Sequence, residues 1–203
     1  CMTRSPRFLW LIPGLGLLSC LGPFSNDLFV PSLSLVAAGM NADPGTVQLT
    51  MTALLIGFSF GSLIYGPLSD RLGRKPVLLF GLSIYSISAL LAAASPSLGA
   101  LVATRALQGL GASSTMVLTR AIVLDRWTGA EASSILLSIA IFMFLAPVLA
   151  PLAGGYIAGF GAWQAVFWVQ AAAGALAFVM TLSFLPRAHA RSGRSVFAGL
   201  RAY

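Results

Sequence analysis

The sequence predicts an all-α membrane protein with six transmembrane helices. Hydrophobic residues make up 58% of its 203 residues and charged residues only 8%. Apolar stretches of about 18 or more residues, long enough to cross a bilayer, recur along the whole chain. The cations gather in short clusters between these stretches, whereas a soluble protein of this size needs a far more charged surface.

Six apolar stretches meet the length requirement. They run from Phe8 to Ala38, Thr46 to Ser69, Pro76 to Ala94, Leu98 to Arg120, Ser133 to Ala158 and Trp163 to Leu185. The first exceeds the roughly 20 residues that a bilayer requires. It also contains Pro23 and Pro31, so we expect it to be bent or tilted and to project beyond the membrane.

The start of the first stretch has a second interpretation. Arg4 and Arg7 before an apolar run are also typical of a secretory signal. The apolar part, however, continues past Cys20 for most of another membrane thickness, and five further stretches follow. We therefore assign this stretch as the first span.

A charged turn joins the second and third stretches. Residues 66–76 read GPLSDRLGRKP and hold one carboxylate, three cations and two glycines. The sequence therefore predicts a tight cytoplasmic hinge between two membrane helices, with Gly66 and Gly73 supplying the backbone freedom that such a turn requires.

The fifth stretch contains an unusual group of helix-disturbing residues. Pro147 and Pro151 are four residues apart and are followed by Gly154 and Gly155. Each proline removes a backbone donor and frees a carbonyl group, so we expect this helix to be kinked. Small residues at a spacing of four predict close helix packing in the second and fifth stretches, at Gly57, Gly61, Ala146, Ala150 and Gly154.

The distribution of cations predicts the orientation of the chain. The links 39–45, 95–97 and 159–162 contain no Lys or Arg. All cations except Arg105 fall on the other side: Arg4, Arg7, Arg71, Arg74, Lys75, Arg120, Arg126, Arg187, Arg191, Arg194 and Arg201. The positive-inside rule then places both termini in the cytoplasm. The same rule explains the net charge of +7 without a nucleic-acid partner.

Two ionisable residues lie well inside the predicted spans. Asp27 is in the first and Arg105 in the fourth, roughly 16 Å and 10 Å from the outer ends of their helices. Intramembrane charges are costly and usually face a partner or a water-filled cavity, so we expect a direct or water-bridged contact between the two. Either Arg105 neutralises Asp27 statically, or Asp27 exchanges protons as its surroundings alternate. We favour proton exchange, because small-residue packing already suffices to hold a static bundle.

Nothing in the sequence predicts an enzyme. The single histidine, His189, lies in the basic tail, and neither a metal-ligand cluster nor a phosphate-binding glycine loop is present. We therefore predict no metal and no cofactor.

Four segments in this order resemble motifs of the major facilitator superfamily. They are the hinge residues Gly66, Leu68, Ser69, Asp70, Arg71, Gly73, Arg74 and Lys75, and the segments Asn26 to Pro31, Arg105 to Ala112 and Ala146 to Gly155. The last resembles the antiporter motif, with Ala150 where many members have glycine. Together the motifs most resemble the Bcr/CflA type of drug:proton antiporter. Gln164 departs from the pattern, since related transporters often have arginine there.

The resemblance implies one half of a twelve-helix transporter of the bacterial inner membrane. Residues 1–185 would form the amino-terminal six-helix domain, as two inverted three-helix repeats, and residues 186–203 would begin a basic central loop. The implied partners are the lipid bilayer, the missing carboxy-terminal half, protons and a small lipophilic substrate. A proton gradient would take the place of a cofactor. A fragment, a natural truncation and a homodimer all remain open.

The resemblance also implies proton-coupled drug efflux by alternating access. Asp27 would carry the proton, Arg105 would tune its release, and Asn26 and Gln108 would line the substrate cavity. Gating would belong to Gly66, Asp70, Arg71, Gly73, Arg74, Lys75 and Asp125. Within this group, Asp70 would pair with the missing half and Arg74 with Asp125. The alternatives are a proton-coupled metabolite uptake symporter of the same fold and a transport-inactive fragment.

Overall fold

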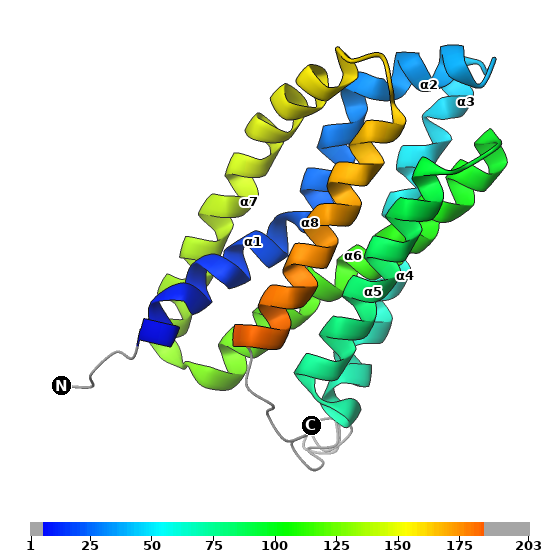
Figure 1. The fold of residues 1–203 in the computed structure, drawn as a ribbon. Coiled ribbons are helices and arrows are strands. Elements are labelled where there is room, and N and C mark those ends of the chain that lie inside the picture. Colours follow the sequence, from blue (N-terminus) through cyan, green and yellow to red (C-terminus); the bar gives the residue numbers. More distant parts are fainter. Residues whose placement is uncertain (1–5, 185–203) are drawn as a thin grey trace.

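The computed structural model describes the backbone of residues 6–184 and the side chains of residues 12–183. Its six long helices are α1 (Pro6–Phe29), α4 (Leu49–Leu72), α5 (Arg74–Ala93), α6 (Leu98–Arg126), α7 (Gly129–Ala158) and α8 (Gln164–Phe184). They run alternately up and down an elongated bundle (Figure 1). Arg4 and the predicted tail 186–203, including His189, lie outside the described residues.

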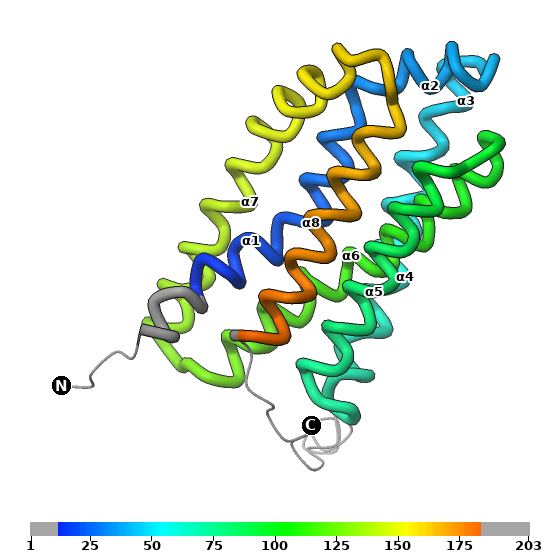
Figure 2. The backbone as a smooth tube through the Cα atoms, in the orientation of Figure 1, coloured from blue at the N-terminus to red at the C-terminus, as the bar shows by residue number. Residues whose placement is uncertain are grey.

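The bundle has two ends, which we call the hinge end and the far end. The hinge end carries Gly73 and the turn at residues 127–128. The far end carries the turns at residues 40–43, 94–97 and 159–163. Three short helical segments, η1 (Val30–Ser32), α2 (Leu33–Gly39) and α3 (Pro44–Val47), cross the far end between α1 and α4 (Figure 2).

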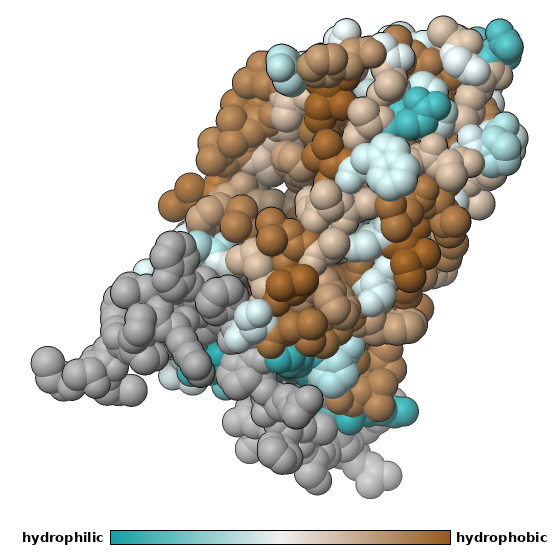
Figure 3. Space-filling view, in the orientation of Figure 1, coloured by the Kyte–Doolittle hydropathy of each residue, from teal (hydrophilic) through white to brown (hydrophobic). Residues whose placement is uncertain are grey.

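The described helices have the length and hydropathy of membrane spans. Five candidates are present within the described residues: Pro44–Leu72, Arg74–Ala93, Leu98–Arg126, Gly129–Ala158 and Gln164–Ser183. They correspond to the second to sixth predicted spans. Helix α1 lies where the first span is predicted but is not among these five candidates. Figure 3 shows apolar residues along much of one face, with hydrophilic residues gathered toward the ends. The all-helical architecture is therefore confirmed.

The first predicted span is not one continuous helix. The α-helix ends at Phe29, the η1 turn follows, and α2 resumes from Leu33 to Gly39. Pro31 explains the break, because it has no backbone N–H and its ring clashes with the carbonyl group four residues earlier. The expected bend is present. The predicted span from Phe8 to Ala38 is therefore two helices, α1 and α2, joined by the η1 turn.

The predicted eleven-residue hinge is wrong in its extent. Helix α4 continues through Gly66 and Pro67 to Leu72, and α5 begins at Arg74. The α4 ladder reaches Gly73, whose N–H donates to the carbonyl of Ser69 at 3.0 Å. Gly73 alone turns the chain, at φ 93° and ψ 151°, a conformation that is essentially restricted to glycine.

The other helices run close to their predicted limits, with one notable extension. Helix α6 continues six residues beyond Arg120 to Arg126, so Asp125 lies on a helix rather than in a loop. Helix α7 passes through Pro147 and Pro151 without a break in its assignment.

Two apolar clusters fill the bundle. One lies toward the hinge end and includes Leu18, Leu82 and Trp127. The other lies toward the far end and includes Leu28, Leu101 and Trp163. On α1, α6 and α8 the two clusters are separated by buried polar residues, and this separation positions the site.

Candidate functional site

A layer of buried polar side chains lies between the two apolar clusters. Its members, which we call the polar layer, are Ser25 on α1, Tyr85 on α5, Arg105 and Gln108 on α6, and Gln170 on α8; each is 0% exposed. Four helices therefore meet in this layer. Polar groups removed from solvent are retained in a bundle only where they are hydrogen-bonded or serve a function.

A directional chain of hydrogen bonds runs through the layer. Arg105 Nη1 donates to Gln108 Oε1 at 3.1 Å, and Gln108 Nε2 donates to Gln170 Oε1 at 2.7 Å. Gln170 Nε2 then donates to the backbone oxygen of Ser25 at 2.9 Å. The chain thus links α6 to α1 through α8, and it orients both amide groups.

The serine hydroxyl extends this chain to a fourth helix. Ser25 Oγ donates to the carbonyl of Leu21 at 2.6 Å and also contacts the hydroxyl of Tyr85. A serine hydroxyl has one hydrogen, so Tyr85 is the donor in the second contact. Tyr85 on α5 is in this way tied to α1.

Arg105 is incompletely satisfied. Its guanidinium carbon lies 4.8 Å from the ring centre of Phe29 and 5.8 Å from that of Phe167. These rings provide a favourable cation–π environment. Its Nε and Nη2 atoms are nevertheless buried without a hydrogen-bond partner. Such a cation strongly favours any arrangement that brings an anion or a water molecule to these donors.

Asp27 lies outside the polar layer. The two ion pairs among the described residues are Arg74–Asp70 and Arg74–Asp125, so Asp27 and Arg105 are not in direct contact. Asp27 follows the inward-facing Ser25 by two residues, a rotation of about 200° around a helix, which directs it to the opposite side of α1. The expected direct contact is absent in this conformation.

Asp27 is half-buried beside another predicted residue. Asn26 Nδ2 donates to Asp27 Oδ1 at 3.5 Å, a long hydrogen bond. The amide oxygen of Asn26 is buried and has no partner. Asn26 therefore has an unpartnered acceptor oxygen next to Ser25 of the polar layer.

The hinge end holds a second polar group, centred on Arg74. Its Nε lies 2.9 Å from Asp125 Oδ2 and its Nη1 lies 2.6 Å from Asp70 Oδ1, while Nη1 also donates to Ser69 Oγ. The expected Arg74–Asp125 contact is present. Arg74 thus ties α4, α5 and α6 together at one point.

The remaining hinge residues are more dispersed. Lys75 Nζ donates to the carbonyl of Leu182 near the end of α8, at 2.8 Å. Arg71 is exposed, and a Cβ added to Gly66 would meet nothing within 4 Å. The structure gathers Asp70, Arg74 and Asp125 but does not bring Gly66 or Arg71 to them.

The proline-containing helix presents its small residues to α1. Ala146, Ala150 and Gly154 are buried, whereas Pro147 and Gly155 are exposed. A Cβ added to Gly154 would collide with the backbone of Leu28. The predicted close packing is confirmed for this stripe, and it sets α7 against the part of α1 that follows Asp27.

Several residues of the polar layer were not predicted from sequence. Gln170 is the clearest, since a long amide side chain inside an apolar span is itself a signal of a buried partner. Tyr85, and Phe167 whose ring lies beside Arg105, give no such signal, because aromatic residues are common in membrane helices.

The family follows from a match over most of the chain. A model of the Major Facilitator Superfamily matches residues 15–201. The chain belongs to the Major Facilitator Superfamily. It is therefore a multi-pass membrane protein from a family of transporters.

Bacterial resistance proteins are among the relatives of this superfamily member. It is 35% identical to the "Bicyclomycin resistance protein homolog" of Haemophilus influenzae, covering 94% of this chain and 48% of the relative. It is also 35% identical to the "Multidrug resistance protein D" of Escherichia coli, covering 81% and 42%. The "Chloramphenicol resistance protein" of Pseudomonas aeruginosa is again 35% identical, with 80% and 41% covered. The resemblance to Bcr/CflA multidrug transporters is confirmed, and the chain spans about half the length of these relatives.

A solved structure supports the fold of the superfamily member independently. The proton:xylose symporter XylE matches with a TM-score of 0.80 at 13% identity, over 91% of this chain and 46% of that one. At this level of identity the match shows the helical arrangement alone.

Proposed function

We propose that the chain forms the amino-terminal half of a proton-coupled exporter of small lipophilic drugs. The supporting observation is a fully buried Arg105, with two unpartnered donors, in a chain similar to several drug-resistance proteins. In this proposal α1, α4 and α5 form one three-helix repeat and α6, α7 and α8 form its inverted counterpart. The hinge end faces the cytoplasm, in keeping with its cations.

Proton coupling is assigned to Asp27. The buried Arg105 keeps two donors without a partner, and a carboxylate that approaches them gains a counter-charge. A movement that turns Asp27 toward Arg105 therefore releases its proton, and the reverse movement allows one to bind. The proton binds from the outer side and leaves to the cytoplasm as drug moves outward.

Substrate contacts are assigned to Asn26 and Gln108. The unpartnered amide oxygen of Asn26 is available for a polar group of a substrate. Both ends of the Gln108 amide are engaged in the polar layer, so its contact with substrate requires the layer to open. Drug binding to Gln108 therefore breaks hydrogen bonds of the polar layer and changes the contacts of Arg105 at the same time.

Gating is assigned to the hinge end. Arg74, Asp70 and Asp125 hold three helices together in the present conformation, and the exposed side of Asp70 is open to the missing carboxy-terminal half. Such partly exposed pairs contribute only about 0 to 1 kcal/mol each, which suffices to bias two conformations of similar energy.

The full-length protein that contains these residues tests the proposal in liposomes loaded with chloramphenicol. For an antiporter, drug leaving the lumen drives protons inward and acidifies it, whereas a symporter makes the lumen more alkaline. A pH-sensitive dye reports the direction. We expect the lumen to become acidic with the wild type. With Asp27→Asn we expect no more acidification than in protein-free liposomes.

Asp43→Asn is the matched control. Asp43 is an exposed far-end carboxylate that caps α3 through the N–H groups of Gly45 and Thr46, and asparagine also caps helices well. We expect it to retain transport. Undiminished drug-driven proton movement by Asp27→Asn would remove the carrier role, and a lumen that becomes alkaline would indicate symport.

A further inference from the structure

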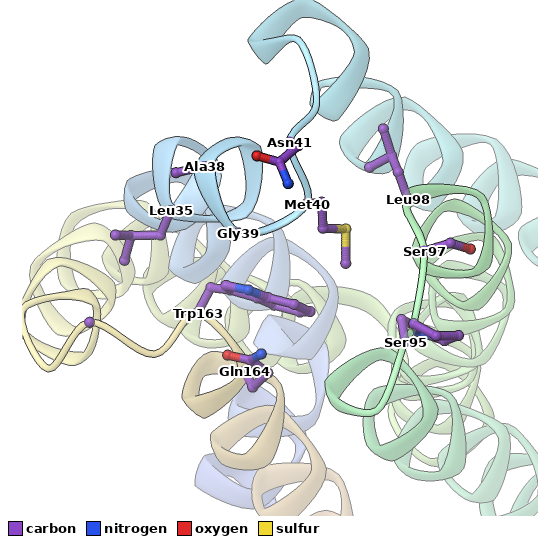
Figure 4. A pocket seen from close by; sticks show the side chains of 12 residues that line it. Leu35, Ala38, Gly39, Met40, Asn41, Ser95, Ser97, Leu98, Trp163 and Gln164 are labelled. Carbon is purple, nitrogen blue, oxygen red and sulfur yellow. The ribbon is translucent and has the colours of Figure 1, made fainter.

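A pocket of about 830 Å³ opens at the far end, away from both Asp27 and the hinge end. It lies where the α2–α3, α5–α6 and α7–α8 turns approach one another (Figure 4). Ligand pockets in proteins typically measure about 300 to 1,000 Å³, so its size suits a small molecule. None of its lining residues is charged.

An indole ring contributes to the lining of the pocket. Trp163 is buried among the far-end cluster, and Figure 4 shows its ring among the lining side chains. Gly39 lies against this ring: an added Cβ would approach Trp163 Nε1 to 3.1 Å, which is tighter than ordinary contact. A glycine here accommodates the indole ring at its present position.

The rim supplies uncharged hydrogen-bonding groups from separate turns. Asn41 adopts a left-handed conformation with φ 48°, which few residues other than glycine and asparagine adopt readily, and its amide lies at the pocket. Gln164 brings a second amide beside Trp163. The hydroxyls of Ser95 and Ser97 are already engaged with the backbone of α5 and α6. Neither amide makes a hydrogen bond to another described residue, so both are available for recognition, as is the hydrogen of the Ser97 hydroxyl, which only accepts in its present bond.

Trp163 also connects the pocket to the surroundings of Arg105. Trp163 and Phe167 pack edge to face, with ring centres 6.0 Å apart and an interplanar angle of 89°. Phe167 in turn lies 5.8 Å from the guanidinium carbon of Arg105. Two direct side-chain contacts therefore connect the pocket to the polar layer.

We propose that this pocket binds an uncharged small molecule with a flat aromatic face and with amide or hydroxyl groups at its edge. The aromatic face packs against the part of Trp163 that lines the pocket, and the polar groups bond to the amides of Asn41 and Gln164. A cation finds no counter-charge here. The inference concerns a site separate from the proposed proton pathway, and it requires no proton coupling.

Equilibrium binding to the full-length protein that contains this chain, in lipid nanodiscs, tests the site without a proton gradient. The probe is radiolabelled chloramphenicol, an uncharged nitroaromatic compound with an amide and two hydroxyl groups. We expect saturable binding that the lipophilic cation tetraphenylphosphonium does not displace. Absence of saturable binding, or equally effective displacement by the cation, would overturn the proposal.

Variants locate the bound probe. Gln164→Leu and Asn41→Gly each remove one amide, and glycine tolerates the left-handed backbone of Asn41, so each should weaken binding about threefold to tenfold. Gln48→Leu is the matched control, because Gln48 is an exposed amide near the same end that does not line the pocket. Binding that survives both pocket variants but is lost with Gln108→Ala would place the probe in the polar layer and refute the far-end site.

Discussion

At the scale of single residues, Gln170 determines the geometry around Arg105. Its amide receives the hydrogen bond from Gln108 and passes one to the carbonyl of Ser25. Because both bonds use fixed ends of the amide, they fix which end of Gln108 faces Arg105. A residue on α8 therefore acts on the proposed proton site without touching Asp27.

This role makes a prediction for Gln170→Leu. The change leaves Gln108 Nε2 without its partner and Ser25 O without its side-chain donor in a buried site, at a cost of about 1 to 3 kcal/mol for each unsatisfied group. We expect a lower unfolding temperature in detergent and slower drug-driven proton movement.

Ser183→Ala, on the same helix, is the control, because the Ser183 hydroxyl is exposed and bonds only within α8. To separate positioning from folding, Gln170→Glu should keep the bond from Gln108 but shift the pH profile of transport, since it adds a carboxylate near Arg105. An unchanged profile at normal abundance of the Gln170→Glu protein would argue against a positioning role.

At the same scale, the sequence predicts which residues are unusual but not what they contact. Arg105 and Asp27 are recognisable because charges are rare in membrane spans. Their separation depends on how α1 is rotated about its axis, and apolar residues on all sides of a membrane helix leave that rotation undetermined. Gln170 shows the same limit. An amide side chain in an apolar span suggests a buried hydrogen-bond partner, but it does not show which residue that partner is.

At the scale of elements, α7 approaches α1 closely at Gly154. Gly154 allows the backbone of α7 to approach Leu28, which follows Asp27 directly. The neighbouring Gly155 points away, with nothing within 4 Å of an added Cβ. The two glycines are adjacent in sequence but have unequal roles.

The pair provides a matched test of this packing. Gly154→Ala forces α7 away from α1, and overpacking of this kind typically costs about 1 to 3 kcal/mol. Gly155→Ala should be neutral or slightly stabilising, because alanine favours helix more than glycine does. Thermal unfolding in detergent measures both, and equal effects would contradict the proposed contact.

Helix limits could be predicted where hydropathy marks them. The starts of α5 and α6 lie within a few residues of prediction because apolar runs begin there. The end of α6 could not be predicted in this way. Charged residues there (Arg120, Asp125 and Arg126) are typical of a loop, yet the helix continues through them. Likewise, Gly66 and Pro67 suggest a turn, but Gly73 alone makes it.

At the scale of the whole molecule, the Arg74 group joins three helices at the end opposite the far-end pocket. We expect Asp125→Asn to slow transport while changing the unfolding free energy by only about 1 kcal/mol or less, since the pair is partly exposed. Transport rates in liposomes at matched protein abundance measure this effect. Glu131→Gln, at an exposed acid in the first turn of α7, should behave like the wild type.

If Asp125→Asn transports as fast as the wild type, the Arg74–Asp125 pair does not bias the conformational change. If it instead unfolds at a much lower temperature, the pair has a structural role rather than a gating one. Only slow transport with near-normal stability supports gating.

The length of α6 has a consequence for how the protein sits in the bilayer. Its 29 residues span about 44 Å, whereas the hydrocarbon core is about 30 Å thick. Helix α7, with 30 residues, is longer still. For a helix along the bilayer normal, the excess of about 14 Å places about two and a half turns in the headgroup region or beyond it, and tilt reduces that length. Asp125 and its partner Arg74 lie within reach of dissolved ions, so we expect ionic strength and anionic lipid to act on the hinge end while leaving the buried polar layer unscreened.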